Sequence, residues 1–243
     1  MNVLLLNGSP KRITAASRYY LGLLGLHTRG CKTTKLYLSG PAMYPKAFQS
    51  FVDIDALVIA LPVYVDGVPA SVLRFLEEAE KFIKENNCSF KLYIISNCGF
   101  YEGTQCKHLL NIMQNFCKTS GLAWGGGIGI GAGEMLSVIR VMLIFAFSQL
   151  ILLIPIALLT DNSFLGDLIT AIVLVLIFSL LSSRMFFAIR KLGKAVRQGN
   201  AIPNLYSGLT LFPRFMFIII SNLYFIVRAS LLGRGYWEIY RKN

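Results

Sequence analysis

The sequence is short of charged residues, and of acidic residues above all. Charged side chains make up 15% of the 243 residues, with 12 Asp and Glu against 24 Lys and Arg, whereas a typical soluble protein carries roughly 25%. Residues 1–136 hold 13 cations and 9 anions, but residues 137–243 hold 11 and 3, separated by long uncharged runs. The cationic excess lies mainly beside those runs. This pattern favours a lipid bilayer as partner and argues against nucleic acid.

Cysteine pairs with metal-ligand spacing are also missing. The five cysteines form no CxxC pair, which excludes the usual iron-sulfur and zinc patterns. Cys98, Cys106 and His108 match no zinc spacing, so we expect no metal site. No charged segment followed by an apolar core and a small-residue cleavage site opens the chain. We therefore expect the N-terminal part to lie in the cytoplasm, where a disulfide framework is not expected.

Residues 1–136 alternate strand and helix signals. Apolar or alternating runs predict strands near 3–6, 31–39, 54–64, 90–100 and 122–133, and amphipathic stretches predict helices at 14–30, 69–87 and 105–121. Thr14 is the expected N-cap of the first helix. This alternation predicts an α/β domain over residues 1–136. Its expected fold is a flavodoxin-like, doubly wound, five-stranded parallel sheet with strand order 2-1-3-4-5.

Residues 137–190 are predicted to form a transmembrane helical hairpin. Residues 141–160 carry no charge, and twenty helical residues cross a hydrocarbon core of about 30 Å. Residues 168–183 are also uncharged, and residues 185–189 extend the return span beyond Arg184. The connector at 160–167 lacks cations, while "RKLGKAVRQGN" after the second span has four. The positive-inside rule therefore predicts a multi-pass cell-membrane protein with its N-terminal domain in the cytoplasm.

A third apolar stretch follows, at residues 209–227. Pro213 and Arg214 interrupt it and leave thirteen uncharged residues, too few for an untilted span. A full crossing would also place the later cations outside, against the charge rule. Residues 191–243 are accordingly predicted as a basic linker, then an interfacial or third membrane helix, then a cytoplasmic tail.

The first loop, "NGSPKRITAAS", permits two interpretations. It follows the first predicted strand, and backbone N–H groups at such a turn, with the start of the next helix, can bind a phosphate. Ser9, Thr14 and Ser17 would add hydroxyl donors, while Lys11 and Arg12 would add positive charge. The other interpretation is an ordinary turn, since Asn-Gly-Ser-Pro is common in turns.

Three loops together carry a resemblance. "NGSPK" with its hydroxyl-bearing helix start, "LPVYVDGVPASVLRFLE" and "SNCGFYEGTQ" resemble the NADPH-dependent FMN reductase group of flavodoxin-like proteins. The resemblance implies FMN as cofactor, NAD(P)H as co-substrate and a homodimer. It places the FMN phosphate at the first loop and the flavin ring between the other two. The cofactor-binding residues that the resemblance implies are Ser9, Lys11, Ser17, Pro62, Val63, Tyr64, Gly67, Asn97, Cys98 and Gly99. Arg12 and Thr14 are added as candidates because of their charge and hydroxyl group in the first loop.

The sequence leaves three functions open. The first is a membrane-anchored FMN-dependent NAD(P)H oxidoreductase that passes electrons to a quinone or another small acceptor. No catalytic side chain is expected there, because the flavin carries the chemistry. Ala15 and Ala16 stand where the family often has hydroxyl or amide side chains. They favour the second function, a non-catalytic membrane protein with a degenerate domain used for assembly or sensing. The third is a flavodoxin-type electron carrier.

Overall fold

The computed structural model describes residues 1–11, 15–159, 165–210, 212–231 and 233. Its centre is a six-stranded parallel sheet with the order β2-β1-β3-β4-β5-β6. The predicted order 2-1-3-4-5 is confirmed, but the prediction of five strands was one short. The added strand is only three residues long, too short for a visible alternation. The strands are β1 (Asn2–Asn7), β2 (Lys32–Tyr37), β3 (Ala56–Pro62), β4 (Lys91–Asn97), β5 (Ala123–Ile130) and β6 (Leu205–Ser207).

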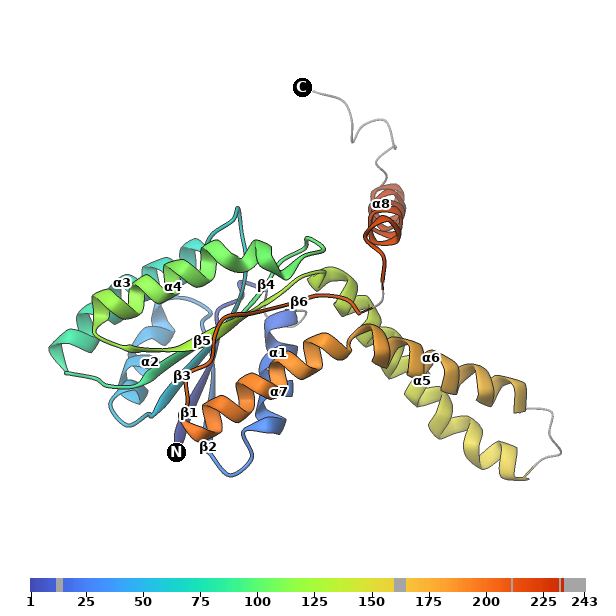
Figure 1. The fold of residues 1–243 in the computed structure, drawn as a ribbon, viewed down its shortest axis with the longest axis horizontal. Coiled ribbons are helices and arrows are strands. Elements are labelled where there is room, and N and C mark those ends of the chain that lie inside the picture. The colour runs from blue at the N-terminus through green and yellow to red at the C-terminus, as the bar shows by residue number, and fades with distance from the viewer. Residues whose placement is uncertain (12–14, 160–164, 211, 232, 234–243) are drawn as a thin grey trace, which may run out of the picture.

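One face of the sheet is covered by α2 (Tyr44–Phe51), α3 (Ala70–Glu85) and α4 (Lys107–Ser120) (Figure 1). The even-numbered residues of β1, Leu4 and Leu6, point into this layer because side chains alternate along a strand. Phe75 of α3 stacks on Phe48 of α2 with ring centroids 5.5 Å apart. The sequence pattern predicted α3 and α4 but not α2, whose eight residues are too few for a clear helical period.

The other face is covered by α1 (Ala16–His27) and α7 (Ser183–Gln198), which pack against each other and on the sheet. Helix α1 starts two residues later than predicted, and Thr14 lies outside the described residues. Met185 and Ile189, assigned by the sequence pattern to the end of a return span, belong to α7. Both are fully buried in the core beside the sheet. This layer therefore depends on residues that follow 136 in the chain.

An antiparallel hairpin, α5 (Gly133–Leu159) and α6 (Leu165–Leu181), projects away from the sheet (Figure 1). It lies between β5 and α7, so it is an insertion in the crossover that joins β5 to the parallel strand β6. The predicted transmembrane character of this hairpin is not supported. Within the described residues, α5 offers only the short apolar stretch Ile139–Leu152. Helix α6 is long enough to span only if it is joined to α7 across a 57° bend.

Helix α8 (Arg214–Leu231) is long and apolar enough to cross a membrane by length and composition, and none of it is buried inside the molecule. Its start is attached to the loop that follows β4. Arg214 Nη1 lies 3.3 Å from Glu102 Oε1. The hydroxyl of Tyr101 donates to the Phe212 carbonyl, and its ring lies 5.4 Å from that of Phe217. A helix of this kind is weak support for a membrane span when it stands alone.

Glycines in β5 permit close approach by neighbouring segments of the same chain. A Cβ at Gly125 would overlap the Tyr93 ring, and a Cβ at Gly129 would lie 2.8 Å from Cys106 Cβ. Real Cβ atoms do not approach other atoms this closely, so larger residues would force the backbone to move. The approaching groups belong to this chain itself.

Tyr93→Phe should lower stability at neutral pH and raise it relative to wild type at high pH. Tyr93 is fully buried, and its hydroxyl donates to the Asn200 carbonyl over 2.9 Å. Loss of this bond should cost about 1 kcal/mol near pH 8. Burial raises the pKa of Tyr93 to about 12. The unfolded chain releases this proton near pH 10, so wild type loses stability as pH rises from 10 to 12. The variant does not share this loss.

Urea unfolding of the detergent-purified protein at pH 8 and at pH 11.5 measures both effects. Tyr64→Phe is the control because Tyr64 is half-exposed in a surface turn. The same stability difference at both pH values would contradict the burial of the Tyr93 hydroxyl.

Candidate functional site

The candidate site lies at the carboxyl ends of the parallel strands, at the point where the strand order reverses direction. From β1 the chain crosses to β2 on one side and then to β3 on the other, so the loops after β1 and β3 diverge at this point. Ligands of open α/β sheets bind in the crevice that such a reversal creates. Gly8 N donates to Ala60 O over 2.9 Å, and Val63 N donates to Asn97 O over 2.8 Å. These bonds hold the loops after β1, β3 and β4 side by side.

The first loop is shaped by Ser9. Its backbone N–H donates to Asn7 Oδ1 over 3.0 Å, and its side-chain oxygen accepts from Lys11 N over 3.3 Å. The Ser9 carbonyl accepts from the hydroxyl of Tyr37 on β2 over 2.9 Å. Ser9 is buried and Lys11 exposed. The N–H groups of residues 9 and 11 are therefore used inside the loop, and Arg12 lies outside the described residues, as does Thr14.

The first turn of α1 has backbone N–H groups that no described residue pairs. Ala15 is the N-cap residue and supplies no side-chain hydrogen bond. Arg18 N donates to Ala15 O over 3.1 Å, but no described residue accepts a bond from the backbone N–H of Ala16 or Ser17. Ser17 is buried in the first turn. Unpaired N–H groups and the positive end of the helix dipole together suit a phosphate.

The second loop is a tight turn. Tyr64 and Gly67 exchange two backbone hydrogen bonds of 3.1 and 3.0 Å. Val65 and Asp66 between them both have positive φ angles, of 47° and 57°. This is the geometry of a two-residue hairpin turn, and it holds the loop in one shape. Pro62, which ends β3, and Val63 lead directly into this turn.

The third loop contains a buried acceptor without a donor. Asn97 ends β4, and its buried Oδ1 atom has no hydrogen-bond partner among the described residues. Such an atom costs free energy unless a ligand or water supplies a donor. The loop is otherwise well fixed, since Cys98 N donates to Ile130 O over 3.0 Å and Gly133 N donates to Cys98 O over 2.8 Å. Gly99, next in the chain, borders an apolar cavity of about 190 Å³ beside α8.

Two buried thiols face each other in this loop. A hydrogen bond from the Cys106 thiol lowers the pKa of Cys98, and the same bond, together with burial, raises the pKa of Cys106. Cys98 Sγ also lies 3.5 Å from Glu102 O. Because Cys98 is only 3% exposed, its thiol packs in the loop and is closed to reagents in solvent.

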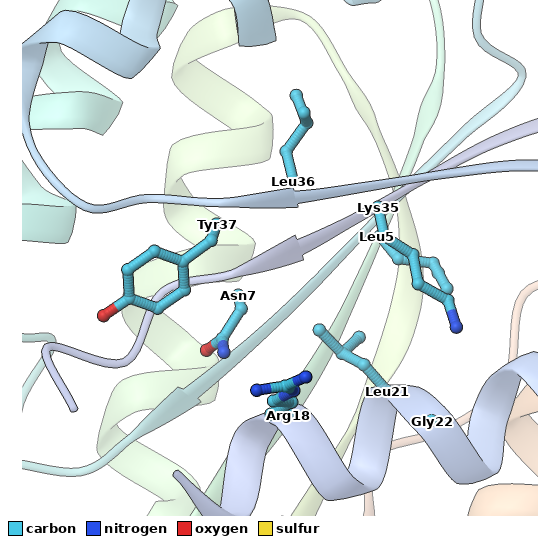
Figure 2. Close-up of a pocket in the computed structure, with 8 residues that line it drawn as sticks. All are labelled: Leu5, Asn7, Arg18, Leu21, Gly22, Lys35, Leu36 and Tyr37. Carbon is cyan, nitrogen blue, oxygen red and sulfur yellow. The ribbon is translucent and has the colours of Figure 1, made fainter. Parts of the chain in front are cut away.

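A groove beside α1 was not recognised from the sequence. It has a volume of about 400 Å³ and lies between α1 and the ends of β1 and β2. Figure 2 shows Asn7 of β1 and Arg18 of α1 pointing toward each other across it. Arg18 and Gly22 lie four residues apart and share a helix face, which was the signal available in the sequence. The lining residues are Leu5, Asn7, Arg18, Leu21, Gly22, Lys35, Leu36 and Tyr37.

Comparison with known proteins finds neither a matching protein-family model nor a matching curated protein. Solved structures resemble the fold. An oxidoreductase from Corynebacterium diphtheriae has a TM-score of 0.48 at 9% identity, over 82% of this chain and 96% of the other. An apo NADH:FMN oxidoreductase has a TM-score of 0.47 at 12% identity, over 78% and 88%.

Rubredoxin oxygen:oxidoreductase from Desulfovibrio gigas has a TM-score of 0.41 at 13% identity. The match covers 51% of this chain and only 28% of that longer protein. By their names, all three proteins are oxidoreductases. Likeness at this level of identity and TM-score does not establish a function for this chain.

Proposed function

We propose that this chain is an FMN-dependent NAD(P)H oxidoreductase held at a membrane. The observation that carries the proposal is the convergence of three loops at the reversal point of the sheet. There an open helix start and the buried Asn97 Oδ1 atom both lack partners among the described residues. The helix start suits an anion, and the Asn97 Oδ1 atom lacks a hydrogen-bond donor. A flavin mononucleotide supplies both, as a phosphate and as the N–H of its ring.

The residues present suit this cofactor. Ser17 and the first N–H groups of α1 would hold the phosphate, with Lys11 adding positive charge. Asn97 Oδ1 would accept a hydrogen bond from the ring, and Tyr64 would border the ring from the second loop. Bound flavin takes hydride from a nicotinamide and passes electrons to an acceptor. The protein has only to bind and orient it, so no side chain is assigned a catalytic role.

Membrane attachment is part of the proposal. Large apolar side chains are exposed on the hairpin and on α8, among them Ile151 at 75%, Leu176 at 64% and Phe215 at 63%. Apolar surface this extensive is rare on monomeric soluble proteins. Attachment at this surface would keep the carboxyl edge of the sheet near lipid-soluble acceptors such as quinones.

Detergent-purified protein incubated with FMN and freed of unbound flavin should retain about one FMN per chain in its visible spectrum. Ser17→Ala should weaken FMN binding about tenfold, because a hydrogen bond to a charged group contributes about 1.5 kcal/mol or more. Ser89→Ala is the matched control, since Ser89 is exposed and precedes β4 at the opposite edge of the sheet. Bleaching of the bound flavin by NADH or NADPH then reports the reductase activity.

One observation favours a different function. The N–H groups of Ser9 and Lys11 are bonded within the loop, and Ala15 offers no side-chain donor, so the loop has fewer free donors than a phosphate site can use. A protein that retains no flavin would support a non-catalytic assembly or sensing module. Bound flavin that neither nicotinamide bleaches would support an electron carrier.

A further inference from the structure

A second cavity lies against α1, close to the groove of Figure 2. Its volume is about 440 Å³, and it is lined by Ala15, Arg18, Tyr19, Gly22, Leu23 and Arg140. Arg18 and Gly22 line both cavities. The two hollows therefore flank one stretch of α1. One is bounded by the edge strand β2, and the other by the start of the hairpin at Arg140.

The charges around these two hollows have one sign. Arg18, Lys35 and Arg140 line them, and none of the described lining residues is Asp or Glu. Within the described part of the chain, the ion pairs join Lys84 to Glu80 and Arg214 to Glu102, and neither pair includes one of these three cations. Clustered cations repel one another unless an anion lies between them. The arrangement suits a negatively charged ligand.

Arg140 carries the strongest sign of a missing partner. Its guanidinium carbon lies 5.1 Å from the centre of the Tyr19 ring, which fixes the side chain in place. Its Nε atom is buried, and no described residue supplies an acceptor for it. A buried guanidinium N–H without an acceptor costs free energy that an anionic oxygen would recover. Arginine binds phosphate oxygens especially well, because its planar fork of donors matches their geometry.

Gly22 keeps the space open. A Cβ built at this position would meet nothing within 4 Å, so the helix surface between the two hollows is bare. A glycine inside a helix costs about 1 kcal/mol relative to alanine. A larger residue at this position would fill the space without changing any charge.

The chain beyond Arg140 indicates what kind of phosphate compound fits. From Val141 onward, α5 exposes apolar side chains, with Val141 at 58% and Ile144 at 61%. A ligand whose phosphate reached Arg18 and Arg140 could lay apolar chains along this surface. We propose that the two cavities along α1, together called the α1 groove and marked by Arg18, Gly22 and Arg140, bind the phosphate group of an anionic phospholipid. We propose it as a site distinct from the FMN site above, although Ala15, the N-cap of α1, lines its second cavity.

Binding of dihexanoyl phosphatidylglycerol, a short-chain lipid that dissolves as a monomer, tests the proposal on full-length protein in nonionic detergent. Isothermal titration should detect binding to wild type and to Arg74→Gln, a control that removes an exposed cation from α3 on the opposite face. The double variant Arg18→Gln/Arg140→Gln should bind about tenfold more weakly or worse. Gly22→Leu should weaken binding similarly without lowering the thermal unfolding temperature, which separates a filled groove from a misfolded protein.

Inorganic phosphate and dihexanoylglycerol, titrated separately, distinguish the sources. Phosphate binding as tight as that of the lipid would overturn the lipid assignment, and so would equal binding of the uncharged diacylglycerol. Lipid affinity unchanged in both the double variant and Gly22→Leu would overturn the site itself. Saturating FMN and Ser17→Ala should leave lipid binding unaltered. Lipid binding would therefore remain even if the protein bound no FMN. Competition between FMN and the lipid would instead show that the two sites are one and would overturn the proposal of a distinct lipid site.

Discussion

Leu192→Asp should prevent the chain from folding. Leu192 lies in α7, has no exposed surface and packs in the core between that helix and the sheet. An aspartate there would bury a charge without a partner, at a cost of at least about 4 kcal/mol. Whole domains are stable by only about 5–15 kcal/mol. Circular dichroism and limited proteolysis of the purified full-length variant should show loss of the cooperative fold, including the sheet built from residues 1–136.

Lys191→Asp is the matched control, because the neighbouring side chain is exposed on the same helix. It makes a larger change in net charge and should nevertheless unfold at a denaturant concentration close to that of wild type. Leu192→Ala provides a graded variant, with an expected loss of about 2–5 kcal/mol. Wild-type stability in Leu192→Asp would mean that α7 does not pack on the sheet.

Gly131→Ala should destabilise the protein by about 3 kcal/mol and disturb the third loop of the candidate site. Gly131 follows β5, and its N–H donates to Ser207 O over 2.8 Å. A Cβ at Gly131 would lie 2.6 Å from Gly103 N, a backbone atom with little freedom to retreat. The strain must be relieved by moving β5 or the loop at residues 101–103. Denaturant midpoints and FMN retention, measured on the same preparation, report the two effects.

Ala132→Gly is the control for this prediction. Ala132 is the next residue and adopts a φ of 56°, a conformation that costs a non-glycine residue about 1–2 kcal/mol. Glycine relieves that strain but loses the buried methyl group and adds entropy to the unfolded chain. The net change should be small. A Gly131→Ala protein as stable as the Ala132→Gly protein would contradict the close approach of the loop to residue 131.

Local patterns account for the predicted elements that the structure confirms. The uninterrupted apolar run of β3 is typical of a strand covered on both faces, and the stripe of Val72, Phe75 and Ala79 indicates one buried side of α3. Each of these patterns is formed by residues that lie only a few positions apart in the chain. The same locality explains why α2 and β6 were missed, since eight and three residues carry too little pattern.

The apolar residues after 136 show the opposite case. Ile189 and Leu192 fit a membrane span or a linker flank equally well from composition alone, because lipid and a protein core are both apolar solvents. Contact with α1 decides that they belong to the core. Only the folded chain shows that α7 completes the layer opposite α3 and α4.

For the candidate site, the sequence by itself determined the order of the three loops and the residues they carry. Strand ends are local features, and a parallel sheet gathers them at one edge. Tertiary structure alone decided which backbone donors remain free, since the bonds of Ser9 and Lys11 within the first loop follow from its folded path. It also brought Arg18 and Arg140, 122 positions apart in the chain, to one cavity. No local pattern encodes a contact of that kind, because it depends on how the hairpin leaves the sheet.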